Sequence, residues 1–143
     1  MLADSVRDVI SNSSMASSLA MYEFTSGSPE PAVFTTEVIP KGCQRPAILI
    51  EDSGGTNWGT RAREGMDAQL VVRIFGDKDR SMDVLRAIAI DLWEALNRAD
   101  LDVHTSGRGY EGVVCLANAP QSIVDEEGFP GFAIIVRAIV LKR

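Results

Sequence analysis

The most recognisable chemical pattern in this 143-residue chain is a glycine-rich hexapeptide at residues 107–112, which reads Gly-Arg-Gly-Tyr-Glu-Gly. Its letters fit GxGxxG, the spacing by which a strand passes into a helix whose N-terminus holds a pyrophosphate. Here the hexapeptide follows a helical pattern and precedes a β-rich one, so the order of elements that the motif requires is absent. The pattern therefore predicts a turn and not a nucleotide site.

The other groups able to do chemistry are isolated from one another in the sequence. His104, the single histidine, has no carboxylate or thiol beside it, and Cys43 and Cys115 share no metal or redox spacing. The acidic run at residues 125–127 lacks the alternating ligands of a calcium loop. We therefore expect no enzyme activity, no catalytic residue, no cofactor and no metal site. Both cysteines are expected to be buried as small apolar side chains, and the acidic run to form an exposed turn.

The strongest structural pattern is a strand followed by a helix between residues 66 and 98. Residues 66–75 alternate in the manner of a strand, and a turn-forming segment at 76–79 ends the alternation. Asp79 or Ser81 can then cap a helix. Its apolar side chains recur at helical spacing and form one stripe: Leu85, Ile88, Ala89, Leu92 and Leu96. This spacing predicts a strand and a helix that bury their apolar sides against each other.

The remaining patterns place further elements around this unit. A short helix is expected over residues 2–11 and a loop over 25–31. Residues 47–76 form a long hairpin that turns at 53–57 and projects from the body. Further strands are expected over 33–39, 113–119 and 132–141. The last of these is apolar on both faces apart from Arg137, so we expect it to lie centrally and to be covered on both sides.

Together these elements predict one domain spanning residues 1–143. Its fold class is α+β, with a mainly antiparallel sheet, two helices packed on one face and a projecting hairpin. The net charge of −6, from 14 basic and 20 acidic residues, argues against tight binding to nucleic-acid phosphates. No apolar run approaches the roughly 20 residues of a membrane span, and the acidic N-terminal segment does not resemble a signal peptide. Synthesis in the cytoplasm is expected.

Several large apolar side chains are left without a place in this core. Ile90 and Trp93 lie beside the helical stripe, Trp58 falls in a polar hairpin, and Val71 and Phe75 face away from the helix. Either loops of the same chain cover them, or they belong to a contact between subunits, where aromatic residues concentrate. The second interpretation gives a candidate interface made of Trp58, Arg61 and Arg63 in the hairpin and of Val71, Phe75 and Trp93 in the body.

The order of these elements resembles a known family. A short helix is followed by a β-rich segment ending in Ile39-Pro40, a strand led by Pro46, a glycine-containing hairpin, the strand at 68–75 and the long helix with Leu92. This arrangement is similar to that of the tail terminators, or tail-completion proteins, of long-tailed bacteriophages and phage-like particles, which include the minor tail protein U type. The likeness covers residues 2–98, and residues 113–142 by strand order.

The resemblance implies a structural protein of the virion tail or neck, made in the cytoplasm of a host bacterium. Such proteins form hexameric rings that cap the head-proximal end of the tail tube, stop its polymerisation and offer a surface to the head-completion or neck protein. DNA would pass through the lumen without specific binding, since an acidic lumen repels it. The alternatives are another neck or head–tail connector ring and, as a third reading, a small ligand-binding domain.

Overall fold

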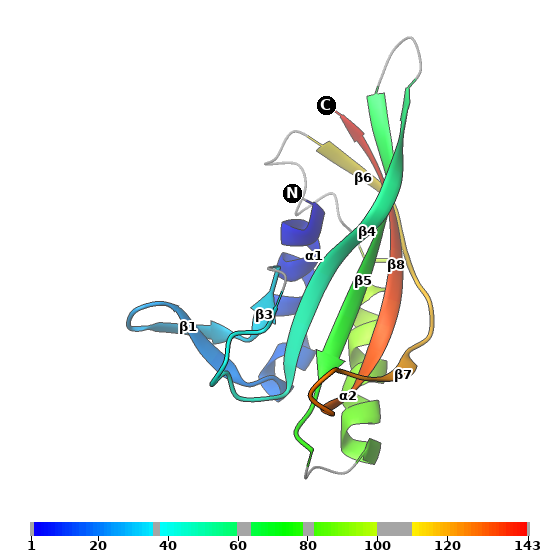
Figure 1. Ribbon diagram of the computed structural model, residues 1–143. Coiled ribbons are helices and arrows are strands. Elements are labelled where there is room, and N and C mark those ends of the chain that lie inside the picture. Colours follow the sequence, from blue (N-terminus) through cyan, green and yellow to red (C-terminus); the bar gives the residue numbers. More distant parts are fainter. Residues whose placement is uncertain (1, 36–37, 60–63, 79–81, 100–109, 143) are drawn as a thin grey trace.

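The computed structural model describes residues 2–35, 38–59, 64–78, 82–99 and 110–142 (Figure 1). Within these residues, two α-helices and one short 3-10 helix accompany eight strands. The helices are α1 (Leu2–Ser11), η1 (Ser14–Ser18) and α2 (Met82–Leu96). The strands are β1 (Met21–Thr25), β2 (Ser28–Pro31), β3 (Val33–Phe34), β4 (Ala47–Gly59), β5 (Glu64–Phe75), β6 (Tyr110–Ala117), β7 (Gln121–Val124) and β8 (Pro130–Lys142).

Six of the strands form one sheet in the order β3-β4-β5-β8-β6, with β7 paired to the first part of β8. All of its pairings are antiparallel except that of β3 with β4. β8 is thus flanked by β5 on one side and by β6 and β7 on the other. The predicted central position of the last strand is confirmed, and so is the α+β class with a mainly antiparallel sheet.

Both α-helices lie on the same face of the sheet, which we call the inner face (Figure 1). The stripe of α2 predicted from helical spacing is buried there against inward-facing residues of β4, β5 and β8. The fully buried large side chains of this core are Val6, Ile10, Val33, Ile48, Ile50, Leu70, Val72, Ile74, Leu92, Leu96, Ile134 and Val136. The expected burial of the strand at 66–75 against the helix is therefore confirmed.

Several hydrogen bonds tie the end of α2 to β6. The Trp93 indole Nε1–H donates to the carbonyl oxygen of Ala117 at 2.9 Å, and the backbone N–H of Ala117 donates to Asn97 Oδ1 at 3.1 Å. The backbone N–H of Arg98 donates to the Cys115 carbonyl at 2.7 Å. These bonds fix the end of α2 against β6. No helix among the described residues is long and apolar enough to cross a membrane.

The predicted long hairpin is present, but its turn lies elsewhere. The serine and glycine content of residues 53–57 predicts a turn, but these residues continue β4. The register of the pairing with β5 shifts between Asp52 and Gly54. Pairing runs as far as Gly59 with Glu64, so the connection falls at 60–63, outside the described residues. The hairpin extends well beyond the helices (Figure 1). The paired backbone overrides the local turn preference of its residues.

Two other expectations about the N-terminal half were wrong. The loop expected over 25–31 is instead part of a separate two-stranded hairpin, β1–β2, with Gly27 at φ +81° in its turn. The strand expected over 33–39 is only two residues long, since β3 comprises Val33 and Phe34. At the other end of the chain, β6 begins at Tyr110 and therefore includes part of the glycine-rich hexapeptide.

The two cysteines differ in their surroundings. Cys115 is buried in the core and its thiol donates to the Leu96 carbonyl at 3.3 Å, as expected for a small apolar side chain. Burial raises the pKa of the Cys115 thiol to about 11. Cys43 is only half-buried, so the expectation that it is buried was wrong. Its pKa is also raised by burial, an effect that the charge of Arg45 opposes.

We expect this difference to appear in thiol labelling at pH 8. The thiolate is the reactive form, and a pKa of about 11 leaves roughly one Cys115 side chain in a thousand ionised at that pH. An aromatic disulfide reagent should therefore modify Cys43 rapidly and Cys115 only as the chain unfolds. The Cys43→Ser variant should lose the rapid phase. Rapid labelling of two thiols in the native protein would contradict the burial of Cys115.

Candidate assembly interface

The described residues bring together no set of chemical groups that resembles an active site. Residues 110–112 of the glycine-rich hexapeptide lie in β6, whereas 107–109 and His104 fall outside the described residues. In the acidic run, Asp125 Oδ1 accepts hydrogen bonds from the backbone N–H groups of Glu127 at 3.0 Å and Phe129 at 2.8 Å. This carboxylate shapes a turn, as expected. In the part of the chain that the structure describes, no group of three or more His, Cys, Asp or Glu side chains could hold a metal ion.

The candidate functional surface is the outer face of the sheet, which is the face opposite the helices. Residues directly paired across strands share a face, so Val71 of β5 and Ile135 of β8 lie side by side there. Gln69, Arg137 and Leu116 form the next row across β5, β8 and β6. Val71, Ile135 and Ile139 are half-buried, and Leu116 is 45% exposed. The inner neighbours of these residues along β8, by contrast, are fully buried.

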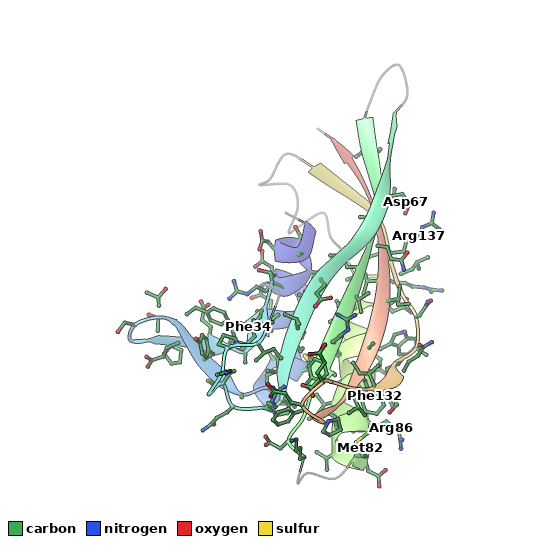
Figure 2. The ribbon with its side chains drawn as sticks, viewed as in Figure 1. Phe34, Asp67, Met82, Arg86, Phe132 and Arg137 are labelled. Carbon is green, nitrogen blue, oxygen red and sulfur yellow. The ribbon has the colours of Figure 1, made fainter. Side chains whose placement is uncertain are left out.

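Two ion pairs cross this outer face. Arg73 of β5 binds Glu51 of β4 through its Nη1 atom. Arg137 of β8 forms a two-point contact with the Asp67 carboxylate of β5, with Nε to Oδ1 at 2.9 Å and Nη2 to Oδ2 at 2.5 Å (Figure 2). The hydrogen bonds from Arg137 lower the pKa of Asp67, so the carboxylate stays ionised below its ordinary range. The Arg137 side chain is nevertheless 59% exposed.

Among the described residues, the chain covers its own outer face near the start of β8 and beside β3. Phe75 points to the outer side but is buried, and the guanidinium of Arg45 lies 5.8 Å from its ring centre and 3.9 Å from that of Phe129. Beside β3, a second apolar cluster buries Phe34 and Leu49. We call the part beyond these covered regions, toward the start of β5 and the end of β8, the open face. It comprises Val71, Leu116, Ile135, Arg137 and Ile139.

The candidate interface residues do not gather in one place. Val71 lies on the open face, but Phe75 is buried by its own chain, and Trp93 is half-buried on the inner side with its indole N–H bonded to β6. Trp58 lies in β4, where only the backbone is described, and Arg61 and Arg63 fall outside the described residues. We therefore retain Val71 for a contact surface and treat Trp93 as a residue that joins helix to sheet.

The interface predicted from the sequence does not include Ile135, Arg137 and Ile139 of the open face. The apolar pattern of 132–141 predicts a strand that is covered on both sides, and such a strand offers no exposed contact surface. The inner residues are buried, but Ile135, Ile139 and Arg137 alternate with them on the open face. Apolarity on both sides of the strand was thus the signal for this surface.

Comparisons with known proteins indicate the fold. No protein-family model and no curated protein sequence matches the chain. Twenty-one chains of solved structures match it. One belongs to a structure described as the virion of a native gene transfer agent particle, with a TM-score of 0.65 and 16% sequence identity. The match covers 98% of this chain and 94% of that one, so the two share a fold along almost their whole length.

Proposed function

We propose that this protein is a structural subunit of a phage-like particle and, within it, a tail terminator. In this role a ring of six copies caps the head-proximal end of the tail tube, stops tube polymerisation and presents a surface to the head-completion or neck protein. The observation that carries the proposal is the fold likeness to a chain of a gene transfer agent virion, which spans nearly all of both chains. The order of elements that resembles the tail-terminator family agrees with it.

The open face supports a role in assembly. Apolar side chains at the centre of a protein contact, with polar groups at its margin, are typical of subunit interfaces. Here Val71, Ile135 and Leu116 supply the apolar centre, and the Arg137–Asp67 pair lies beside them. Closed rings use heterologous contacts, in which one patch meets a different patch on the next copy. The open face would be one of those two patches.

The net charge of the chain agrees with a ring through which DNA passes. With a net charge of −6, a ring of six copies carries a large negative charge, which repels phosphates and lets a duplex pass without specific binding. The partners of the ring are then the tail-tube protein on one side and the neck protein on the other. No catalytic step is assigned to any of these contacts.

Two measurements test this function. Size-exclusion chromatography with light scattering should give the mass of six chains, either alone or on isolated tube ends. Addition of the protein to polymerising tail-tube protein of the same particle should shorten the tubes and stop their growth in proportion to its concentration. Tubes of unchanged length would contradict the terminator role, and a ring that leaves them unchanged would instead fit a head–tail connector. A chain that stays monomeric under both conditions would contradict both roles.

A further inference from the structure

The β1–β2 hairpin is an arm that the main sheet does not require. Its strands pair only with each other and form a separate two-stranded sheet. The arm extends away from the body on the side opposite β8, to the left in Figure 1. Because it points away, it does not lie on the open face of its own chain. An independent two-stranded hairpin is marginally stable in water, so its presence raises the question of what holds it and what it contacts.

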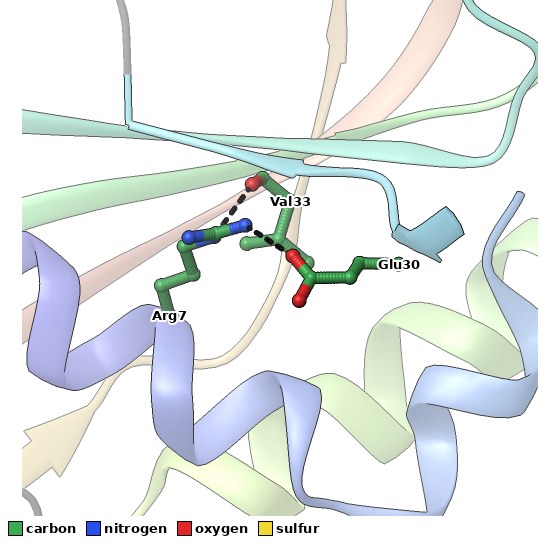
Figure 3. Close-up of polar contacts among 3 residues, drawn as sticks. All are labelled: Arg7, Glu30 and Val33. Atoms are coloured by element: carbon green, nitrogen blue, oxygen red, sulfur yellow. Dashed lines mark hydrogen bonds and ion pairs between the residues drawn. The ribbon is translucent and has the colours of Figure 1, made fainter. Parts of the chain in front are cut away.

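The base of the arm is fixed by Arg7 of α1 (Figure 3). The Arg7 Nε–H donates to the Val33 carbonyl at 3.1 Å, and Nη2 contacts Glu30 of β2 at 3.4 Å. The same guanidinium lies 4.6 Å from the ring centre of Phe24. The rings of Tyr22, Phe24 and Phe34 are mutually 5.1 Å apart between centres and form one aromatic cluster. The arm is thus held in a set direction before it meets a partner, which lowers the entropic cost of binding.

One face of the arm carries apolar side chains and one carboxylate, that of Glu23. Met21 and Glu23 alternate onto the same side of β1, and they pair with Pro31 and Pro29 of β2. Met21 is 53% exposed, and Glu23 and Pro29 are exposed. Within the described part of the chain, no ion pair is found for Glu23. Residues 21–31 contain two glutamates and no basic residue.

The open face has the opposite arrangement, a single exposed arginine among apolar side chains. Leu116 of β6 and Gln69 of β5 pair directly with Arg137, and Val71 lies diagonally across from it. Ile135 and Ile139 are its neighbours on the same face of β8. Asp67 uses the Nε and Nη2 donors of Arg137, and a guanidinium carries five N–H donors in all. A second carboxylate can therefore bind the same arginine. Glu23 of the arm and Arg137 of the open face carry opposite charges, and apolar side chains lie beside both.

From this complementarity we infer that the β1–β2 arm of one copy binds the open face of the next copy, with Glu23 against Arg137 and Met21 against the apolar residues around it. The inference rests on the proposed ring. The arm extends from the β3 edge of the sheet, and the open face lies over β5, β8 and β6, so the two are different patches of the subunit. Each copy therefore gives its arm to one neighbour and receives the arm of the other. Such a contact is heterologous and can close into a ring.

A charge exchange tests the contact between Glu23 and Arg137. Glu23→Arg and Arg137→Glu should each raise the concentration at which half of the chains assemble by about tenfold or more, because each places like charges together. The double variant should recover most of the loss. Glu126→Arg makes the same charge change at an exposed turn residue outside both patches, and it should assemble as the unaltered chain does. Thermal unfolding of each variant reports whether the subunit itself has changed.

Disulfide trapping gives an independent measurement. In a Cys43→Ser background, a Glu23→Cys chain mixed with an Arg137→Cys chain should form a cross-linked pair under mild oxidation, and neither chain alone should do so. A chain with both cysteines should form a ladder of multimers up to the ring. If the unaltered protein forms rings but the double variant shows no recovery and no cross-link forms, the arm contact is wrong while the proposed function stands. A protein that never self-associates, in solution or on the tube end, would overturn both.

Discussion

Ile135→Glu is expected to leave the subunit folded and to prevent its assembly into rings. Ile135 is half-buried on the open face, so in an isolated subunit the new carboxylate remains in contact with water. The cost to subunit stability should stay within about 1 kcal/mol, the range of strand preferences at exposed sites. In the ring the same carboxylate would be buried among apolar groups and close to Glu23 of the neighbour's arm. We expect the half-assembly concentration to rise at least about a hundredfold.

The neighbouring residue provides a matched control. Ile134 precedes Ile135 in β8 and points to the inner face, where it is fully buried. Ile134→Glu places the same carboxylate in the core, and we expect a loss of about 4 kcal/mol or more in the free energy of unfolding. Chemical denaturation measures this loss, and light scattering measures assembly. Assembly of Ile135→Glu at the concentration of the unaltered chain would exclude the open face as a subunit contact.

The parts of the fold that could be predicted from the sequence are those in which apolar residues recur at a regular helical or strand spacing. The stripe of α2 and the alternation of β5 are long enough for burial to dominate over the preferences of single residues. Residues 53–57 show the opposite case. Their glycines and serines favour a turn, yet pairing with β5 on one side continues the strand past them. Local composition contains no information about that pairing, so it could not predict that the strand continues.

The arm could have been recognised from a weaker signal. Ser26 and Gly27 are the two residues between Thr25 and Ser28, and a two-residue Ser-Gly connection between β-prone segments is a hairpin signal. The prolines that follow, Pro29 and Pro31, favoured a loop instead. Both prolines fit in β2 because this two-stranded sheet has only edge strands, on which proline is tolerated. The contact of Arg7 with the arm depends on tertiary structure and could not be inferred from spacing.

The open face illustrates a general ambiguity of apolar strands. A strand that is apolar on both sides is buried on both sides, but the sequence does not say whether its own chain or another copy covers the second side. β8 shows this ambiguity, since Ile134 and Ile135 are the same residue type. Ile134 is fully buried, whereas Ile135 is half-buried. Arg137 is informative because it interrupts the apolar pattern on the outer side only. A charged residue that lies between apolar residues and stays 59% exposed while paired with Asp67 fits a specific contact better than a packed interior.

Gly131→Ala is expected to destabilise the subunit itself. A Cβ atom at Gly131 would lie 2.4 Å from the Ile74 carbonyl oxygen and 2.7 Å from Cδ1 of Phe75. Neither can move easily, because Gly131 is paired with Phe75 of β5 and with Ile123 of β7. In addition, the Gly76 N–H donates to the Pro130 carbonyl at 2.9 Å. The strands must therefore separate, at a cost of about 3 kcal/mol, the upper part of the usual range for overpacking. In a chain of this size the melting temperature should fall by roughly 10 °C.

Gly42→Ala separates this steric effect from the general cost of replacing glycine. Gly42 has a φ of +83° and no atom within 4 Å of an added Cβ, so only the backbone conformation opposes the change. We expect a loss of about 1 kcal/mol there. Thermal and denaturant unfolding of the two variants, with assembly disrupted by Ile135→Glu in both, compares them in the isolated subunit. Equal losses would mean that β5 and β8 accommodate the methyl group at Gly131 without separating, and that the close approach of the two strands contributes little to stability.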